Sequence, residues 1–485
     1  MIVNKLNILF QGISTEQIIG SVDITINSVQ QDSRNVTKND LFFAISGVES
    51  DGHSYIDKAI NNGAIAIVCN ICPKSINSDV TYIVVADTSS ILGVIASRYY
   101  GNPSEQLKLI GVTGTNGKTT ITTLLHQLVT NLGNKVGLLS TVVNKIGSRQ
   151  ENSTHTTPEP IILNKYLAEM VEEGCSYCFM EVSSHSIVQN RINGLTFCGG
   201  VFTNLSHDHL DYHKTFAEYL KAKKLFFDNL PSNAFALVNS DDKNGSVMLQ
   251  NCKAKKYNFG IRTLADYNAK IIEIHFDGTN VLIENNDLWI QFLGDFNVSN
   301  ILAVYGVANL LGFDKYETLT AISLLRPVDG RFQTIKSSTG VLAIIDYAHT
   351  PDALENVLKT ISELKNQANV ITVVGAGGNR DKTKRPVMAK IAANYSSLVI
   401  LTSDNPRFEE PSEILKDMEK GIPTEKLNIV LVIEDRKQAI RTACMMAKPG
   451  DIVLIAGKGH ETYQEIKGTR FHFDDKEEVN NFFNK

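Results

Sequence analysis

The sequence predicts an α/β protein with three domains: a small N-terminal α/β domain, a central P-loop-type domain with a mostly parallel sheet, and a C-terminal doubly wound, Rossmann-like domain. The chain has 485 residues, 43% of them hydrophobic, which is enough for about three domains with their own cores. Apolar runs alternate with helical patterns from residue 106 to the end, as in parallel sheets. A glycine-rich turn that ends in Gly-Lys-Thr follows one of these runs.

We place the three domains at residues 1–101, 102–328 and 329–485. Two linkers are expected between them. The segments 99–105 and 326–332 both contain Gly and Pro and interrupt the surrounding patterns. In the first domain, the segments 29–34, 40–47 and 51–53 have the composition of strand ends and loops. Their polar groups either meet a ligand or only form turns.

Composition excludes several classes of function. The formal net charge is −5, from 47 basic and 52 acidic residues, so nothing indicates a nucleic-acid partner or an anionic membrane surface. Apolar runs such as 64–68 are much shorter than the roughly 18 residues of a membrane span. The N-terminus has no export signal. We therefore expect a cytoplasmic enzyme, by default a monomer.

The seven cysteines fit reduced thiols better than a disulfide framework, because their number is odd and the chain is long. The pairs Cys69/Cys72 and Cys175/Cys178 have the spacing of a zinc ribbon. Because about a hundred residues separate the pairs and most of these cysteines adjoin apolar runs, we interpret them as buried thiols.

The segment 111–120, Gly-Val-Thr-Gly-Thr-Asn-Gly-Lys-Thr-Thr, is predicted to be a phosphate-binding loop between a buried strand and a helix. Such a turn directs backbone N–H groups and the positive end of a helix dipole at one point. Lys118 would reach the outer phosphates of a nucleotide, and the Thr119 hydroxyl would bind Mg²⁺. The loop is one residue longer than the usual frame, and a plain turn is the alternative.

Two further strands of the central domain are predicted to end in polar residues. One stops at Glu181, which is placed to bind Mg²⁺ beside the loop. The other leads into a cluster with His207, His209 and His213. We discount zinc there because no cysteine is near, and loop hydrogen bonding remains the alternative for these histidines. The helix predicted at 219–227 carries three lysines, which by pattern alone form a solvated face.

Four predicted strands of the last domain, at 341–345, 370–374, 398–401 and 452–455, lead into polar or glycine-rich loops. All four loops should open on one edge of the sheet. We interpret the glycine-rich loop at 375–378 as an anion-binding loop, because the charged residues after it do not suit a dinucleotide fingerprint.

A nucleotide-binding domain that faces such loops across a hinge suggests a ligase and not a simple ATPase. The γ-phosphate would pass to a carboxylate, and an amine would attack the acyl phosphate. Asp404 and Glu461 would position ammonium groups, while Arg380 and Arg407 would bind carboxylates of an amino acid. Arg331 would reach a phosphate across the domain boundary. Domain closure would exclude water.

Five motifs, at 111–120, 181–185, 204–213, 346–351 and 457–461, together resemble the Mur ligases, in the order of that family and across all three domains. The resemblance is greatest to members that add the third residue of the peptidoglycan stem peptide. It implies ATP and Mg²⁺ as cofactors and UDP-N-acetylmuramoyl-L-alanyl-D-glutamate as substrate. The implied ATP-binding residues are Gly114, Thr115, Asn116, Gly117, Lys118, Thr119, Thr120, Asn300, Arg331 and Asp346.

The resemblance also assigns the other ligands. It makes the N-terminal domain the UDP-binding domain, with Ser33 as its uridine-binding serine. Lys223 matches the lysine that the family carbamylates to bridge Mg²⁺. As a carbamate it would bind the metal together with Thr119, Glu181 and His209. The catalytic residues that the resemblance implies are Lys118, Lys223, His209 and Glu181. The muramoyl dipeptide would be bound by Thr156, Thr157, Ser183, Gln189 and Arg191.

The segment 404–407, Asp-Asn-Pro-Arg, resembles the signature of the meso-diaminopimelate-adding members. The distal carboxylate of diaminopimelate would pair with Arg407, and lysine offers no such group. The resemblance implies a diaminopimelate site made of Arg380, Asp404, Asn405, Pro406, Arg407, Gly457 and Glu461. The segment 47–52 departs from the family, since no His follows its first Gly and Glu49 would put negative charge near a diphosphate.

Three alternatives stay open at this point. The first is a ligase of the same family that adds L-lysine. The second is a ligase like folylpolyglutamate synthase, which the separate N-terminal domain and the 404–407 loop argue against. The third is a P-loop switch that hydrolyses ATP without an amino acid and needs no second domain rich in Arg and carboxylates.

Overall fold

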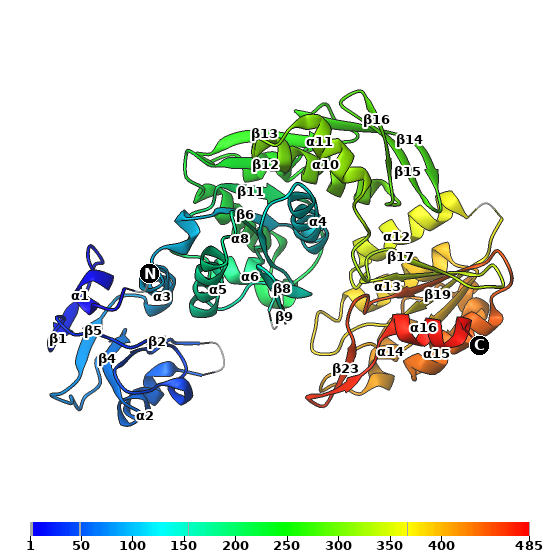
Figure 1. Cartoon of the computed structure of the whole chain (residues 1–485). Helices are drawn as coiled ribbons and strands as arrows, with labels where there is room; N and C mark the ends of the chain where they lie inside the picture. The colour runs from blue at the N-terminus through cyan, green and yellow to red at the C-terminus, as the bar shows by residue number, and fades with distance from the viewer. Residues whose placement is uncertain (1–2, 48–49, 154, 366, 485) are drawn as a thin grey trace.

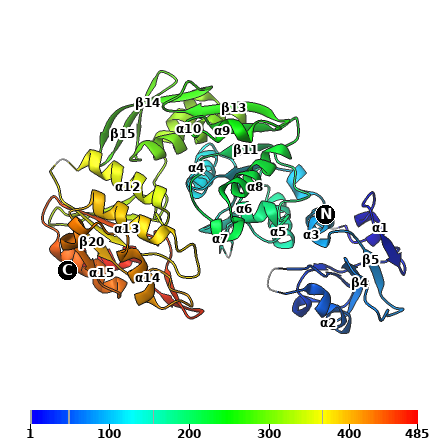
Figure 2. The ribbon, with the colours of Figure 1, turned by 180° about the vertical axis from the view of Figure 1, so that it is seen from behind.

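The computed structural model describes residues 3–47, 50–153, 155–365 and 367–484. Three large sheets follow one another along the described chain and form three bodies arranged in an arc, with the central body between the two terminal ones (Figures 1 and 2). The predicted α/β class with three domains is confirmed.

The N-terminal sheet has five strands in the order β1-β5-β4-β3-β2, parallel except for the edge strand β1. Asp40 begins β3 and is buried, and its carboxylate accepts hydrogen bonds from the Thr37 N–H and hydroxyl, so it does not face a ligand. The strands are β1 Gln17–Ile19, β2 Val29–Gln30, β3 Asp40–Phe43, β4 Ala64–Cys69 and β5 Thr81–Val84; the α-helices are α1 Leu6–Leu9, α2 Ile56–Asn61 and α3 Thr88–Tyr99.

The central sheet has eleven strands in the order β16-β15-β14-β13-β12-β11-β6-β10-β7-β8-β9. The strands from β14 to β7 run parallel to their neighbours, and antiparallel strands extend both edges. The strands are β6 Lys108–Thr113, β7 Val136–Leu139, β8 Val143–Ile146, β9 Arg149–Asn152, β10 Tyr177–Glu181, β11 Gly199–Phe202, β12 Phe235–Asn239, β13 Lys255–Gly260, β14 Tyr267–His275, β15 Gly278–Ile283 and β16 Asn286–Ile290.

Helices cover both faces of this central sheet. The apolar residues of α4 and α10 share one buried core with the strands, and those of α5 and α8 share another. The helices are α4 Lys118–Asn131, α5 Pro160–Glu172, α6 Ser184–Val188, α7 Leu210–His213, α8 Phe216–Asp228, α9 Gly245–Met248, α10 Asp295–Leu310 and α11 Lys315–Ser323.

The C-terminal sheet has the order β17-β18-β22-β19-β20-β21, with β17 antiparallel and the others parallel. One core lies under α12, α13 and α14, and a second lies under α15 and α16, so the sheet is doubly wound as predicted. The strands are β17 Gln333–Lys336, β18 Leu342–Asp346, β19 Val370–Val374, β20 Leu398–Leu401, β21 Val430–Val432 and β22 Ile452–Ala456; the helices are α12 Pro351–Leu364, α13 Lys384–Tyr395, α14 Pro411–Glu419, α15 Arg436–Met446 and α16 Asp475–Phe483. The strands β23 Tyr463–Ile466 and β24 Thr469–His472 form a separate antiparallel pair.

The four predicted strands that lead into polar loops are β18, β19, β20 and β22. They are mutually parallel neighbours, so their four loops open on one edge, as expected from the sequence.

The cysteines are free thiols. Cys69, Cys175 and Cys178 are buried, as expected from the sequence, whereas Cys72 is only half-buried. Burial raises the pKa of the Cys69 thiol to about 11. No helix in the described part of the chain has the length and apolar character to cross a membrane.

Candidate active site

The predicted phosphate loop joins β6 to α4 and is braced by the end of β11. The N–H groups of Thr115 and Asn116 donate to the backbone and side-chain oxygens of Asn204, each at 2.9 Å. The Thr203 hydroxyl donates to the Asn116 carbonyl at 2.6 Å. Gly117 has φ +89° directly before α4, a conformation that favours glycine. The loop is thus a rigid strand-turn-helix unit.

Two lysine ammonium groups meet at one carbonyl of this loop. Lys118 Nζ donates to the Gly114 oxygen at 2.8 Å and to the Thr115 oxygen at 2.9 Å. Lys223 Nζ, from α8, donates to the same Gly114 oxygen at 2.8 Å and lies 4.6 Å from the centre of the Tyr219 ring. Burial lowers the pKa of both amines, and their mutual repulsion lowers that of Lys223 further. The lysine predicted from pattern alone to be solvated is instead fully buried beside the phosphate loop.

Thr119, Glu181 and His209 line one cavity of about 240 Å³ together with Lys118. Glu181, at the end of β10, is fully buried and accepts hydrogen bonds from the Thr141 N–H at 2.7 Å and its hydroxyl at 3.1 Å. Burial lowers the pKa of His209 to about 3, so its ring is neutral. A carboxylate, a hydroxyl and a neutral imidazole therefore face the same space.

The three histidines of the 207–213 cluster turn to different partners. His209 Nε2 lies 3.3 Å from an Asp208 oxygen, and His213 Nε2 lies 2.8 Å from the Ser184 hydroxyl. His207 Nε2 lies 3.1 Å from Asp381 of the C-terminal domain. Within the described residues, no three or more His, Cys, Asp or Glu side chains gather as a metal-binding group.

The C-terminal domain supplies the opposite wall of the 240 Å³ cavity. Six of the residues assigned to diaminopimelate line it, namely Arg380, Asp404, Asn405, Arg407, Gly457 and Glu461. Pro406 does not, and its carbonyl packs against Gly378, where a Cβ would clash. Gly457 has φ +118°, and a Cβ there would lie 2.6 Å from Asp404 Oδ2. The tight approach of the 404 and 457 loops therefore requires glycine.

Lys458 holds these two loops together, and the sequence analysis did not assign it. Its ammonium is fully buried and donates to Asn405 Oδ1 at 3.0 Å and to the Tyr463 carbonyl at 2.6 Å. Asn405 Oδ1 also accepts from the Glu465 N–H, so Nδ2 must point to Glu461 Oε2, at 2.7 Å. The position of Lys458 inside the Gly-Lys-Gly-His-Glu motif was the sequence signal that could have identified it.

The carboxylates of Asp404 and Glu461 respond differently to the burial that they share. Burial by itself would raise the pKa of Asp404, but the positive charges of Lys458 and Arg436 hold it below its ordinary value. Burial and the negative charge of Asp404 raise the pKa of Glu461. The site thus pairs a firmly ionised acid with a weaker one.

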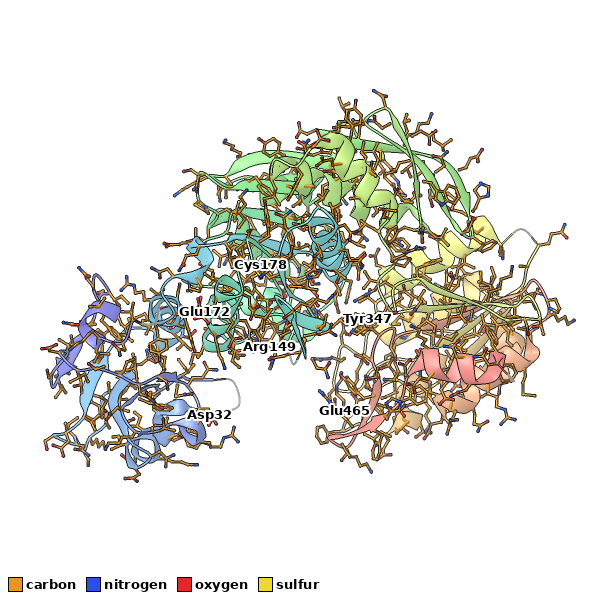
Figure 3. All side chains as sticks on the ribbon, viewed as in Figure 1. Asp32, Arg149, Glu172, Cys178, Tyr347 and Glu465 are labelled. Atoms are coloured by element: carbon orange, nitrogen blue, oxygen red, sulfur yellow. The ribbon has the colours of Figure 1, made fainter. Side chains whose placement is uncertain are left out.

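A second cavity, of about 250 Å³, lies on the other side of the phosphate loop. The predicted ATP residues Asn116, Gly117, Thr120, Asn300, Arg331 and Asp346 line it. Arg331 also lines the first cavity, and its guanidinium lies 4.5 Å from the centre of the Tyr347 ring. Tyr347 lies where the C-terminal domain faces the central one (Figure 3).

The residues assigned to the muramoyl dipeptide form a connected group beside the first cavity. Among them only Thr156 lines it. The Thr157 hydroxyl donates to the Glu181 carbonyl at 2.8 Å, and Arg191 donates to the Thr157 carbonyl and to Gln189. Ser183 accepts from the Ser186 N–H at the start of α6. These hydrogen bonds join the group to the end of β10.

Ser33 does not lie at either of the two cavities. It is buried in the N-terminal domain, where its carbonyl accepts from Asn62, and it lines neither cavity. Val48 and Glu49, where the sequence departs from the family, lie outside the described residues.

Side-chain contacts join the central and C-terminal domains around the two cavities. Asn116 donates to Asp352 at 3.0 Å, and an Arg331 nitrogen lies 3.3 Å from the Thr119 hydroxyl. A rigid phosphate loop thus faces a second domain that offers carboxylates and guanidinium groups. That is the arrangement of an ATP-dependent ligase, in which one domain binds the nucleotide and the other the incoming substrate.

Comparison with known proteins agrees with this class. Three family descriptions match successive parts of the chain: "Mur ligase family, catalytic domain" at residues 25–100, "Mur ligase middle domain" at 112–308 and "Mur ligase, glutamate ligase domain" at 330–459. This chain belongs to the Mur ligase family.

Its relatives cover its full length. The UDP-N-acetylmuramoyl-L-alanyl-D-glutamate–2,6-diaminopimelate ligase of Bacteroides thetaiotaomicron is 56% identical over 480 residues, which is 99% of this chain and 100% of the relative. The protein of the same name from Parabacteroides distasonis is 55% identical over 99% of both chains. A solved structure of a ligase with this name has a TM-score of 0.71 and 32% identity, and covers 100% of this chain and 99% of its own.

Asp346 gives the site a titration that can be measured. Burial raises the pKa of this carboxyl from 3.8 to about 6, although the Phe332 N–H donates to it at 2.7 Å. The folded protein therefore binds the proton more tightly than the unfolded chain. The contribution to stability is full below about pH 4 and falls by ~3 kcal/mol as the pH rises through 6.

Asp346→Asn, which stays neutral, should consequently gain stability over the parent as the pH rises from 4.5 to 7. Thermal melts of both proteins at the two pH values measure the change. Asp277→Asn is the control, because Asp277 is exposed. An equal difference in Tm at both pH values would contradict the raised pKa.

Proposed function

We propose that this protein adds meso-diaminopimelate to the D-glutamate of UDP-N-acetylmuramoyl-L-alanyl-D-glutamate in an ATP-dependent, ADP-forming reaction. The observation that carries the proposal is the position of Arg407 and Asp404 on the cavity wall opposite Lys118 and Thr119. An amino acid with an extra carboxylate and a distal ammonium group matches those charges. The names of the full-length relatives support the same substrates.

Arg407 has the donors that this role requires. Its Nη1 donates to the Gly378 carbonyl at 2.8 Å, and its Nε lies 3.9 Å from a Glu465 oxygen. A guanidinium has five N–H donors in a planar fork, so donors remain for a carboxylate. Arg380, which is exposed beside it, would bind the second carboxylate of the amino acid. Asp404, Asn405 and Glu461 would then bind its ammonium group.

ATP and the UDP substrate would be bound by the remaining predicted binding residues. ATP would lie along the phosphate loop, with Asn300, Arg331 and Asp346 on the side of the second cavity. The dipeptide end of the UDP substrate would reach Thr156 and its bonded neighbours, with its uridine at Ser33. The N-terminal domain would hold the UDP end at a distance from the reacting groups.

The residues near the phosphate loop fit a magnesium ion. Mg²⁺ prefers oxygen ligands and usually takes only a few from the protein. Thr119, Glu181, His209 and the carbamate of Lys223 would hold it. When bound, Mg²⁺ neutralises the charge of phosphate oxygens.

The carbamate fits the surroundings of Lys223. Burial lowers the pKa of the Lys223 amine, which favours the neutral, nucleophilic form that addition to CO₂ requires. In the described part of the chain no carboxylate forms an ion pair with the Lys223 side chain, so conversion to a carbamate would disrupt no ion pair.

In the reaction, the carboxylate of D-glutamate attacks the γ-phosphorus of ATP and ADP leaves. The amine of diaminopimelate then attacks the acyl carbon, and phosphate departs from the tetrahedral intermediate. Lys118 and Arg331 would stabilise the negative charge that develops on the phosphoryl oxygens. The two domains would exclude water from the acyl phosphate, because they contact each other around the cavity.

We place the domains that divide this work at residues 1–101, 102–328 and 329–485. The boundaries fall after α3, which ends at Tyr99, and before β17, which begins at Gln333. A monomeric state and a cytoplasmic location remain predictions from the sequence.

The proposal is tested by ADP release from ATP and UDP-N-acetylmuramoyl-L-alanyl-D-glutamate with one amino acid at a time. We expect release with meso-diaminopimelate, and at least about 100-fold lower kcat/KM with L-lysine and L-ornithine, because the half-buried Arg407 guanidinium would be left without its carboxylate partner. Release with lysine but not diaminopimelate would contradict the substrate assignment. Release without any amino acid would instead indicate a P-loop switch, and release with folate and glutamate a folylpolyglutamate synthase.

A further inference from the structure

Lys384 is the first residue of α13, and it is 93% buried. Among the described residues, its ammonium group has no hydrogen-bond or ion-pair partner. It is 7% exposed and lines the 240 Å³ cavity. The structure records no hydrogen bond or ion pair for its ammonium group anywhere in the described ranges. The next residue, Arg385, is also buried, but it pairs with Glu409 at 2.9 Å and with Asp417 at 3.0 Å. The absence of a partner is therefore particular to Lys384.

A buried cation without a partner is unfavourable unless an anion joins it. The charge of Lys384 acts on two neighbours in the same cavity without contacting them. Burial and, next to it, the positive charge of Lys384 lower the pKa of His349 to about 4. The same charge helps to hold the Asp208 carboxyl ionised against its burial. Neither group lies within ion-pair distance, so the cavity itself is the place for the missing anion.

The position of Lys384 depends on contact between the domains. His207 of the central domain lies 3.1 Å from Asp381, in the loop that precedes α13. Asp381 in turn accepts from the Thr383 N–H at 2.9 Å and from its hydroxyl at 2.6 Å. This chain of contacts fixes the turn before Lys384. The domain contact thus places a cation across the cavity from Lys118 and Glu181.

We propose that Lys384 is a catalytic residue that binds an anionic oxygen at the reacting centre. That oxygen belongs to the acceptor carboxylate or to the phosphoryl group that it receives. The inference rests on the proposed function. As the carboxylate oxygen bonds to the γ-phosphorus and the bond to ADP breaks, the acyl phosphate retains negative charge, which the ammonium balances. When the amine adds and the C–O bond breaks, phosphate leaves with that charge and takes up the proton that the amine loses. Lys384 donates hydrogen bonds and transfers no proton.

The test is Lys384→Met, with Lys390→Met as the matched control, since Lys390 is an exposed lysine on the same helix. Acyl phosphate formation is measured without amino acid, by trapping with hydroxylamine, alongside ADP release in the full reaction. We expect Lys384→Met to lower both rates about 100-fold, as the loss of one donor to developing charge does. The KM for diaminopimelate should stay within about twofold, because binding of the amine uses other residues. Lys390→Met should behave as the parent protein does.

The KM values identify the source of the anion. A higher KM for the UDP substrate assigns Lys384 to the acceptor carboxylate, and a higher KM for ATP assigns it to the transferred phosphoryl group. Parental trapping rates in Lys384→Met would overturn the proposal, as would an effect confined to the KM for diaminopimelate. If the Met variant does not fold, Lys384→Gln, which keeps a polar end without charge, is judged by the same criteria. A parent protein that forms no ADP with its proposed substrates would refute the proposed function. Parental rates in both Lys384→Met and Lys384→Gln would refute only the role of Lys384.

Discussion

Lys223→Ala is expected to lower kcat for ADP release by about 1,000-fold or more, equivalent to roughly 4 kcal/mol of transition-state stabilisation. The expectation follows from the position of Lys223, whose amine lies on the Gly114 carbonyl inside the phosphate loop. As a carbamate it would place a negative group beside Thr119 and Glu181, where a metal ion needs one. Alanine removes both the amine and any carbamate.

Short-chain carboxylates such as formate and acetate should restore part of the activity of this variant, because they supply the missing anionic oxygens in a space that alanine vacates. The parent protein should not respond to them. Lys221→Ala is the control, since Lys221 is exposed on the same helix. Full activity of Lys223→Ala without additives would eliminate the bridging role. A loss without rescue, in a variant with the parental Tm, would assign the effect to the amine and not to a carbamate.

Arg407→Met is expected to lower kcat/KM for diaminopimelate by about 100- to 1,000-fold, since breaking a charge-assisted pair with a carboxylate costs roughly 2–5 kcal/mol. Arg407 has φ +52°, and its Nη1 is held by the Gly378 carbonyl, so its fork is fixed towards the cavity. The KM for ATP should be unchanged, because the arginine lies on the opposite wall. Arg407→Lys should recover only part of the loss, because an ammonium cannot form the planar two-bond contact.

Kinetics with diaminopimelate and with L-lysine measure this prediction in both variants. Arg441→Met, an exposed arginine on α15, is the control. Thermal melts separate a lost contact from a disordered loop, because the Arg407 side chain also holds Gly378. If the loss is the same for lysine as for diaminopimelate, Arg407 does not recognise the distal carboxylate.

The sequence by itself determined the fold class and most of the elements. Strands such as β10, β19 and β20 were predictable to the residue, because short apolar runs between turn residues are local signals. The strand β18 is shifted by one residue from its expected bounds, since element ends depend on capping and tertiary contacts. The parallel alternation also implied that the four polar loops would open on one edge.

Only the tertiary structure decided which side chains share a cavity. Pattern alone made Lys223 a solvated lysine, and the packing of α8 against the phosphate loop buries it. Lys384 gave no local signal of its own, because the burial of an ammonium group depends on segments far away in the sequence. The contact between His207 and Asp381 joins residues 174 positions apart. Local patterns fix secondary structure, whereas the charges that meet across a domain boundary are set by how the domains pack.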